Sequence, residues 1–277
     1  MAKIIVVTNF SQSSRNALDY TCAFFNKAEV NILLLHIYSF SASLAGDAMA
    51  IAAMSETITN DELKLKREIE WVNNSYPNTN INAEMITGVF MDELKEKIAA
   101  EEAALVVMGA AGNYNELLSW DVNIINAFID LATPVLIVPA EKQYRSIEKI
   151  AFACNYYRDN LLKPVSMIRR LIEFTKAQLY VIHVVVPTET ISETALNNKL
   201  ALQENIQMLD PIYYEPALDN IVNAVDEFTA TEQIDMLIVI PSRHGIWSNI
   251  FQQNHTKGLV YLNHTPVLSL HQQPAFI

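Results

Sequence analysis

The chain contains two copies of one pattern of apolar segments, and this internal repeat restricts its fold more than any other feature. Residues 3–9 (KIIVVTN) resemble residues 149–155 (KIAFACN), 146 positions later. Residues 30–36 resemble residues 177–183 at an offset of 147, and both segments end in histidine. Two copies in 277 residues predict two similar domains, because a solenoid needs three or more short repeats.

The later segments of the repeat follow in the same order at a shorter spacing. Leu105–Met108 resembles Leu237–Ile240, and Thr133–Val138 resembles Thr265–Leu270, both at an offset of 132. The drop in offset from 147 to 132 predicts that the second copy is about fifteen residues shorter in its middle.

Each half alternates short apolar runs with amphipathic stretches. The runs are rich in Val, Ile and Leu without polar alternation, which is typical of parallel strands buried on both faces. Between them, spacings of three and four predict helices, as in residues 161–172, while residues 61–76 predict an exposed surface helix. We therefore expect an α/β fold of two domains, residues 1–141 and 146–277, each with a five-stranded parallel sheet and helices on both faces. The expected strands are residues 3–8, 30–38, 81–87, 104–108, 134–138, 148–154, 178–186, 211–215, 235–240 and 266–270.

The charge and cysteine content exclude several classes of protein. With 31 acidic and 19 basic residues, the net charge of −12 disfavours binding to nucleic acid or to an anionic membrane. Cys22 and Cys154 are too few for a disulfide framework and indicate a reducing compartment. No stretch reaches the roughly 20 apolar residues of a membrane span, and the first apolar run is too short for a signal peptide. These features predict a cytoplasmic location.

Open parallel sheets bind ligands at the carboxyl ends of strands, where the strand order reverses. In the first half, the loops after the first and fourth strands would meet there. They are residues 8–11 and the G-x-x-G segment from Gly109 to Gly112. Such glycines allow a close approach to a ligand, although a loop that only needs positive φ explains them equally well.

Several motifs together resemble the universal stress protein family in its tandem form. They are Thr8, Phe10, Ser11 and Ser13, residues 106–112 (VVMGAAG) and residues 133–139 (TPVLIVP). The resemblance covers nearly the whole chain and implies a Rossmann-like fold with strand order 3-2-1-4-5. It also implies pairing through the last strand, which the two halves would form internally as a pseudo-dimer. A homodimer of two chains and an unidentified protein partner remain open.

The nucleotide-binding branch of that family carries G-x2-G-x9-G-[ST] and an aspartate after the first strand. Gly109 and Gly112 match the first two glycines, but Val122-Asn123 occupies the last pair and Asn9 replaces the aspartate. The second half departs further from the motif. Its corresponding residues are Pro241, His244, Asn254-His255 and Asn155.

These departures predict a degenerate nucleotide pocket formed by Asn9, Gly109, Gly112, Val122 and Asn123. The β-branched Val122 adds bulk and holds the backbone away from positive φ. Asp121 would repel a polyphosphate, whereas the Asn123 amide could partly replace the lost hydroxyl. We expect no tightly bound cofactor, with ATP bound in the first half as the alternative.

Other titratable residues have weaker functional interpretations. Arg243, His244, His255 and Lys257 either form an anion site in the second half or belong to a solvated loop. No carboxylate or cysteine stands at metal-ligand spacing beside these histidines, so we expect no metal.

His36 and His183 end equivalent strands, which favours a repeated structural role for both over catalysis. Cys154 is interpreted as a small buried hydrophobic residue, with a reactive thiol as the alternative.

Three classes of function remain at this point. The leading hypothesis is a non-enzymatic stress-response or regulatory protein that acts through binding and assembly. The alternative is an ATP- or nucleotide-binding stress sensor that uses the first-half pocket. A nucleotide-hydrolysing enzyme is the third hypothesis, but the sequence shows no Ser-His-Asp set, carboxylate pair or metal cluster that would support it.

Overall fold

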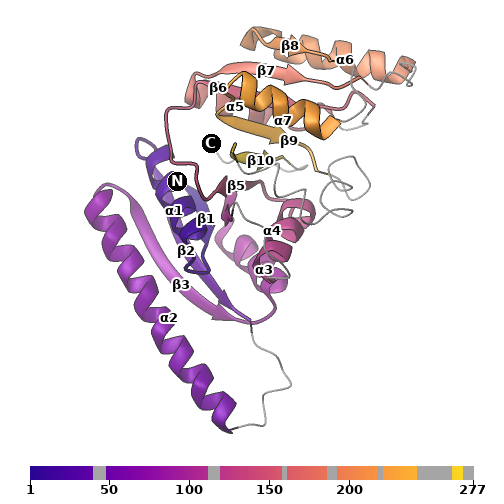
Figure 1. Cartoon of the computed structure of the whole chain (residues 1–277). Coiled ribbons are helices and arrows are strands. Elements are labelled where there is room, and N and C mark those ends of the chain that lie inside the picture. The colour runs from indigo at the N-terminus through magenta and orange to yellow at the C-terminus, as the bar shows by residue number, and fades with distance from the viewer. Residues whose placement is uncertain are drawn as a thin grey trace.

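The two halves of the chain form one continuous ten-stranded sheet in the computed structural model (Figure 1). The strand order is β3-β2-β1-β4-β5-β10-β9-β6-β7-β8, so each half has the expected order 3-2-1-4-5. The structure describes residues 1–39, 48–111, 119–157, 161–185, 192–216, 221–241 and 264–270.

The ten strands lie at the segments predicted from the apolar runs, and their ends differ by a few residues. Strands within each half pair in parallel, and inner strands such as β4, β5 and β9 are buried on both faces, whereas the edge strands β3 and β8 are largely exposed. The strands are β1 (Ala2–Val7), β2 (Val30–Tyr38), β3 (Asn80–Thr87), β4 (Leu105–Ala110), β5 (Val135–Pro139), β6 (Lys149–Ala153), β7 (Gln178–Ile182), β8 (Ile212–Tyr214), β9 (Met236–Val239) and β10 (Val267–Ser269).

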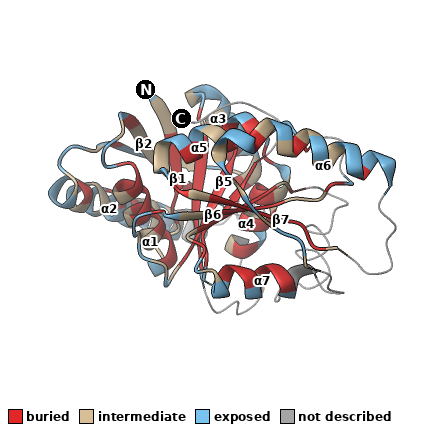
Figure 2. Ribbon diagram, turned by 90° about the horizontal axis from the view of Figure 1, so that it is seen from above, coloured by how far each residue is buried: buried red, intermediate tan, exposed pale blue. Residues whose placement is uncertain are grey.

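Helices cover both faces of the sheet, as the alternating pattern predicted. One apolar core lies between the sheet and α1, α2, α5 and α6, and a second lies between the sheet and α3, α4 and α7. Buried residues follow the strands and the inner helix faces in Figure 2. The helices are α1 (Gln12–Phe24), α2 (Ala48–Ser75), α3 (Phe90–Glu101), α4 (Ser119–Asp130), α5 (Val165–Thr175), α6 (Glu193–Ile206) and α7 (Ile221–Thr231). A short 3-10 helix, η2 (Gln207–Leu209), follows directly after α6.

The halves join through their last strands, which is the internal pairing that the family resemblance implied. β5 and β10 run antiparallel, with Val135 opposite Ser269. The Ser269 hydroxyl is fully buried and lies 3.0 Å from the Val135 amide nitrogen, whose hydrogen it accepts. Both apolar cores continue across this junction. The domain limits at residues 141 and 146 stay a prediction.

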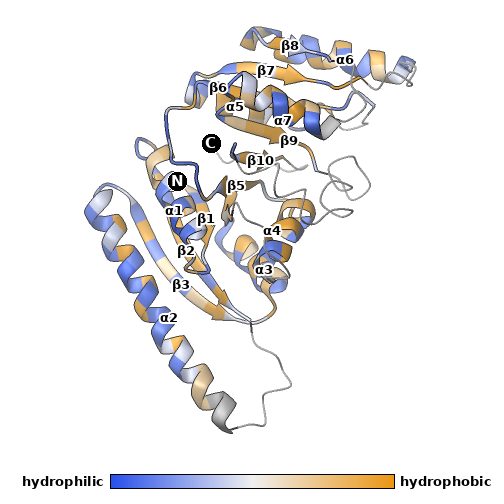
Figure 3. Cartoon of the chain, in the orientation of Figure 1, coloured by the Kyte–Doolittle hydropathy of each residue, from blue (hydrophilic) through white to orange (hydrophobic). Residues whose placement is uncertain are grey.

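Helix α2 is longer than the surface helix predicted at residues 61–76. It begins at Ala48, so the alanine- and methionine-rich segment before residue 61 belongs to the same helix. Leu65 and Val72 are buried against the sheet, while most of the helix surface is hydrophilic in Figure 3. Figure 1 shows α2 running alongside β3, so it covers the outer edge of the first half.

The structure corrects the repeat offset at the fourth strand of each half. Ile4 in β1 pairs with Leu105, and its counterpart Ile150 pairs with Met236. Leu105 therefore corresponds to Met236 at an offset of 131, whereas the sequence comparison predicted 132. Leu105 and Met236 also contribute to the same apolar core. The error arose because both strands are apolar on both faces, so a shift of one residue leaves the pattern unchanged.

Candidate functional site

The strand order reverses at β1, which lies between β2 and β4 in the first half. The carboxyl ends of these strands bring Asn9, His36 and Gly109 to one edge of the sheet. This is the edge at which the sequence predicted a ligand pocket.

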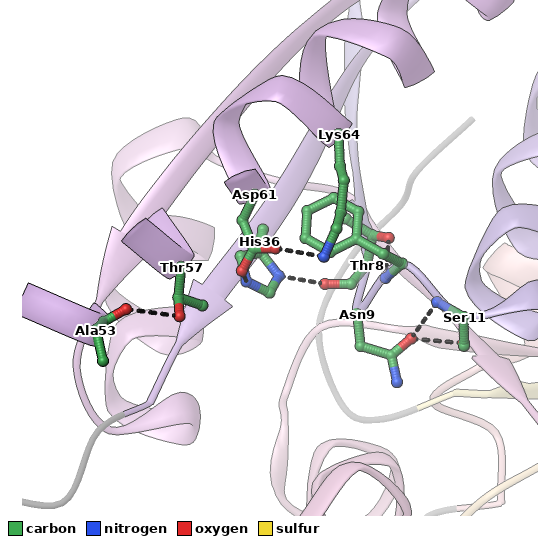
Figure 4. A network of polar contacts seen from close by, with 9 residues as sticks. Thr8, Asn9, Ser11, His36, Ala53, Thr57, Asp61 and Lys64 are labelled. Carbon is green, nitrogen blue, oxygen red and sulfur yellow. Dashed lines mark hydrogen bonds and ion pairs between the residues drawn. The ribbon is translucent and has the colours of Figure 1, made fainter. Parts of the chain in front are cut away.

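The Asn9 side chain is used by the chain itself. Its Oδ1 atom accepts hydrogen bonds from the Ser11 amide at 3.1 Å and from the Ser11 hydroxyl at 2.6 Å (Figure 4). Ser11 in turn caps α1, where its Oγ atom accepts a hydrogen bond from the Ser14 amide at 3.2 Å. Asn9 therefore stabilises the turn that starts α1.

The aromatic ring of Phe10 and the buried imidazole of His36 lie at the carboxyl ends of β1 and β2. The rings of Phe10 and His36 lie 4.5 Å apart, and the Lys64 ammonium lies 4.9 Å from the centre of the Phe10 ring. His36 Nδ1 donates a hydrogen bond to the Thr8 carbonyl at 2.8 Å. Phe10 has a φ of 62°, an uncommon conformation for a residue with a bulky side chain.

Helix α2 closes this edge through Asp61. Asp61 Oδ1 accepts a hydrogen bond from Lys64 at 2.7 Å, and its Oδ2 lies 3.4 Å from His36 Nε2 (Figure 4). The second contact has an ion-pair distance but not the geometry of a hydrogen bond. His36 and Asp61 are both buried, so this polar group is shielded from water by α2.

The second half repeats this arrangement with different residues. His183 Nδ1 lies 3.3 Å from the Cys154 carbonyl, and the Tyr156 ring lies 4.1 Å from the His183 ring. Lys199 lies 5.6 Å from the centre of the Tyr156 ring, and Asn155 Oδ1 accepts a hydrogen bond from the Tyr157 amide at 3.0 Å. The two histidines thus have equivalent packing roles, as the repeat predicted.

Tyr156 is fixed further by Glu215, which follows β8. The Tyr156 hydroxyl donates to Glu215 Oε1 at 3.0 Å, and Lys199 donates to Glu215 Oε2 at 2.6 Å. Burial raises the pKa of Tyr156, so its hydroxyl remains a hydrogen-bond donor. We name the two groups, Phe10–His36–Lys64 and Tyr156–His183–Lys199, the strand-end stacks.

Gly109 is required by packing between the protein's own elements. A Cβ atom at this position would lie 2.1 Å from the Ser13 carbonyl oxygen and 2.6 Å from the Ser14 nitrogen. The Gly109 carbonyl also accepts a hydrogen bond from Trp120 Nε1 at 3.0 Å. The close approach that the glycine allows is therefore that of α1 to β4. Gly112 lies outside the described residues.

The first turn of α4 carries an inward carboxylate. Asp121 is buried, and desolvation raises its pKa above the ordinary value. Val122 is 43% exposed, so its side chain is open to solvent at the start of α4. Asn123 is half-buried beside it. In this turn, Asp121 is the side chain that packs inside.

The corrected offset also changes the comparison of the glycine motifs. At 131 positions, Ile240 corresponds to Gly109, whereas the sequence comparison placed Pro241 there. The second half thus has a branched side chain at this position. The predicted anion site lies outside the described residues, as do the remaining motif positions of this half. Those residues are Arg243, His244, Asn254, His255 and Lys257.

The Cys154 thiol and the possible metal-binding side chains are further candidate sites of chemistry. Burial raises the pKa of the Cys154 thiol to about 12, so the thiolate that would act as a nucleophile is scarce at neutral pH. Within the described ranges, no three His, Cys, Asp or Glu side chains gather closely enough to hold a metal ion. Across the same ranges, every helix is too short or too polar to cross a bilayer.

Comparisons with known proteins agree with this architecture. Residues 1–139 match the Universal stress protein family. A universal stress protein from Archaeoglobus fulgidus has the same fold, with a TM-score of 0.69 and 16% identity over 98% of this chain and 96% of that chain. A functionally unknown protein from Pseudomonas aeruginosa PAO1 is similar with a TM-score of 0.54 and 12% identity, over 98% and 93% of the two chains. No curated protein matches the chain. Because the matched residues span half of its length and the fold agrees, the chain belongs to the universal stress protein family.

Proposed function

We propose that this chain is a non-enzymatic stress-response protein that acts through binding and assembly, and that neither half holds ATP tightly. The observation that carries the proposal is the pair of strand-end stacks. In each half, the chain's own aromatic ring packs on a histidine at the edge where an open parallel sheet takes its ligand.

The remaining polar groups of the first-half edge support the same proposal. Asn9 Oδ1 already accepts a hydrogen bond from the Ser11 amide, and Gly109 is needed for the packing of α1 against β4. Asp121 adds negative charge at the start of α4, where a phosphate would otherwise meet a favourable helix dipole. These features support the proposal that the first half does not hold a nucleoside triphosphate tightly.

A calorimetric titration with Mg-ATP tests the proposal. We expect no saturable binding below about 1 mM, and phosphate release equal to the protein-free background. A dissociation constant in the micromolar range would overturn the proposal in favour of an ATP-binding sensor. Turnover of ATP above background would instead favour a nucleotide hydrolase.

A double variant tests whether the Phe10 ring and the Asp121 carboxylate are what prevents ATP from binding. Combining Phe10→Ala with Asp121→Asn removes both from the first-half edge. We expect this variant to bind Mg-ATP about tenfold more tightly than the parent chain, since it loses a steric and a charge barrier. The matched control, Met208→Ala with Asp92→Asn, changes exposed residues that belong to neither strand-end stack and should bind as the parent does. Equal affinity in both variants would show that the ring and carboxylate are not the barrier.

A further inference from the structure

A polar cavity of about 750 Å³ lies where the two halves join. The segment from Glu141 to Lys149 forms one wall, the carboxyl end of α7 forms another, and His264 with Thr265 completes it. It therefore sits where β5 ends and β6, β9 and β10 begin. Asn9, Gly109 and Asp121 do not line it, so it is separate from the strand-end edge described above.

Hydrogen bonds fix the connecting segment at both ends. The Asn16 side-chain amide in α1 donates to the carbonyls of Pro139 at 2.8 Å and Lys142 at 2.9 Å. At the other end, Asp235 Oδ2 accepts hydrogen bonds from the amides of Glu148 at 2.9 Å and Lys149 at 3.0 Å. The cavity walls are thus held in place without a ligand, which reduces the ordering cost of binding one.

The middle of the segment is anchored by an aromatic side chain. Tyr144 packs edge-on against Tyr20 with 5.3 Å between ring centres, and its ring lies 5.9 Å from that of Phe24. Its two neighbours in the chain, Gln143 and Arg145, line the cavity. The anchored tyrosine therefore limits the positions that Arg145 can adopt.

The first half provides an internal comparison for these lining residues. The offset of 131 continues through the preceding helix, because Ala103 donates to the Ile98 carbonyl just as Ile234 donates to the Thr229 carbonyl. Three lining residues of the second half are polar where the first half has apolar counterparts. The pairs are Thr229 for Ile98 and Asp235 for Ala104 at this offset, and His264 for Ala132 at the offset of 132 that relates the last strands β5 and β10.

Two basic side chains of the connecting segment, Lys142 and Arg145, are available to a ligand. Neither Lys142 nor Arg145 has an ion-pair partner among the residues that the structure describes. Lys149 is engaged, since its ammonium donates to the Glu232 carbonyl at 2.8 Å. Glu141 and Glu148 also line the cavity, so it offers acceptors beside the two cations.

We propose that this junction cavity binds a small organic anion that carries one phosphate or carboxylate group together with hydroxyl or amino donors. Arg145 and Lys142 bind the anionic group, because guanidinium and ammonium groups form strong charge-assisted hydrogen bonds with such oxygens. Thr229 and the glutamates accept hydrogen bonds from the donors of the same ligand. The cavity volume is within the usual range for small-molecule sites.

Glycerol 3-phosphate is the probe, because it combines a phosphate with two hydroxyl groups. Titration of the full chain by calorimetry should give a dissociation constant below about 1 mM, with much weaker binding of glycerol and of inorganic phosphate alone. Backbone NMR signals should shift at Ala230, Gln233 and Thr265, which line the cavity, and stay unchanged at Asn9.

Two variants locate the site. Arg145→Gln should weaken binding about tenfold through loss of a charge-assisted contact. Arg67→Gln removes the same charge from the exposed surface of α2 and should leave the affinity within twofold. The proposal is wrong if the parent chain shows no saturable binding, or if both variants weaken binding equally. Thr229→Ile, which installs the first-half residue, should also weaken binding, and an unchanged affinity would contradict the assigned role of Thr229.

Discussion

Gly109 lies where the start of α1 comes closest to β4. The two atoms nearest to a Cβ added at Gly109 are the carbonyl oxygen and carbonyl carbon of Ser13. These are backbone atoms, so they cannot move aside without shifting the helix. Overpacking of this kind typically costs one to several kcal/mol. The glycine therefore contributes to stability whether or not a ligand ever reaches it.

The variant Gly109→Ala should lower the free energy of unfolding by about 3 kcal/mol, because α1 must move away from β4. Urea denaturation measures this change. Gly88→Ala is the matched control, since the three atoms nearest to its added Cβ all belong to the flexible Glu93 side chain. It should cost less than about 1 kcal/mol. Equal losses in the two variants would contradict the packing role of Gly109.

The negative charge of Asp121 lowers the stability of the folded state. Its carboxyl is buried, and burial raises the pKa in the folded state above the unfolded value. The folded state therefore binds the proton more tightly than the unfolded state does. This linkage makes the ionised carboxylate destabilising at neutral pH, and the penalty disappears as the pH falls below the unfolded pKa.

Asp121→Asn should consequently raise the free energy of unfolding by about 1 kcal/mol at neutral pH. The gain should shrink toward zero near pH 4, measured by urea denaturation at both pH values. Asp92→Asn changes an exposed acid in the first turn of α3 and should cost a few tenths of a kcal/mol. A gain for Asp121→Asn that does not depend on pH would show that charge is not its cause.

Single residues were the hardest features to predict from the sequence. The motif correctly drew attention to Gly109, but a glycine that approaches a ligand and one that approaches a helix have the same sequence signal. The pairing of His36 with Asp61 depends on the position of α2 relative to β2, which no local pattern encodes. Phe10 was recognised as part of a family motif, while its stacking on His36 became visible only in the structure.

Among the elements, α1 and α5 join the two halves on one face of the sheet. Phe174 in α5 packs edge-on against Phe24 with 5.6 Å between ring centres, and its ring lies 6.1 Å from that of Phe25. Phe24 also contacts Tyr144 of the connecting segment. This aromatic cluster therefore couples the helices of the first and second halves.

Phe174→Ala should remove about 2 kcal/mol from the free energy of unfolding, which is less than for a fully buried phenylalanine because Phe174 is half-buried. Weaker coupling should also broaden the thermal unfolding transition, which calorimetry measures. The exposed Leu200→Ala in α6 is the control and should change stability by no more than about 0.5 kcal/mol. A Phe174 variant as stable as the control would mean that the aromatic cluster does not couple the halves.

Elements were predicted well where periodicity is strong and less well where it is absent. The strands stand out because short β-branched runs alternate with amphipathic stretches. The surface helix predicted at residues 61–76 covers only the second part of α2, and Ala52 and Ala53 in the first part are exposed and supply no apolar face. The predicted alignment of β9 with β4 was wrong by one residue, because both faces of each strand are apolar.

At the scale of the whole molecule, duplication and pairing of the last strands convert two sheets into one. Among the strands that the structure describes, the antiparallel contact of β5 with β10 leaves β3 and β8 at the outer edges of the sheet. The repeat in the sequence predicted the two halves, and the family resemblance implied how they join. The cavity at their junction was not predictable, since it forms from segments that meet only after the sheet has assembled.

The central claim is that both strand-end edges are occupied by the chain's own rings rather than by a nucleotide. The most direct test is to denature the freshly purified chain with acid and quantify the released adenine nucleotide by mass spectrometry. A dissociation constant above about 1 mM predicts release of less than about 0.05 nucleotide per chain after purification. Release approaching one nucleotide per chain would contradict the account.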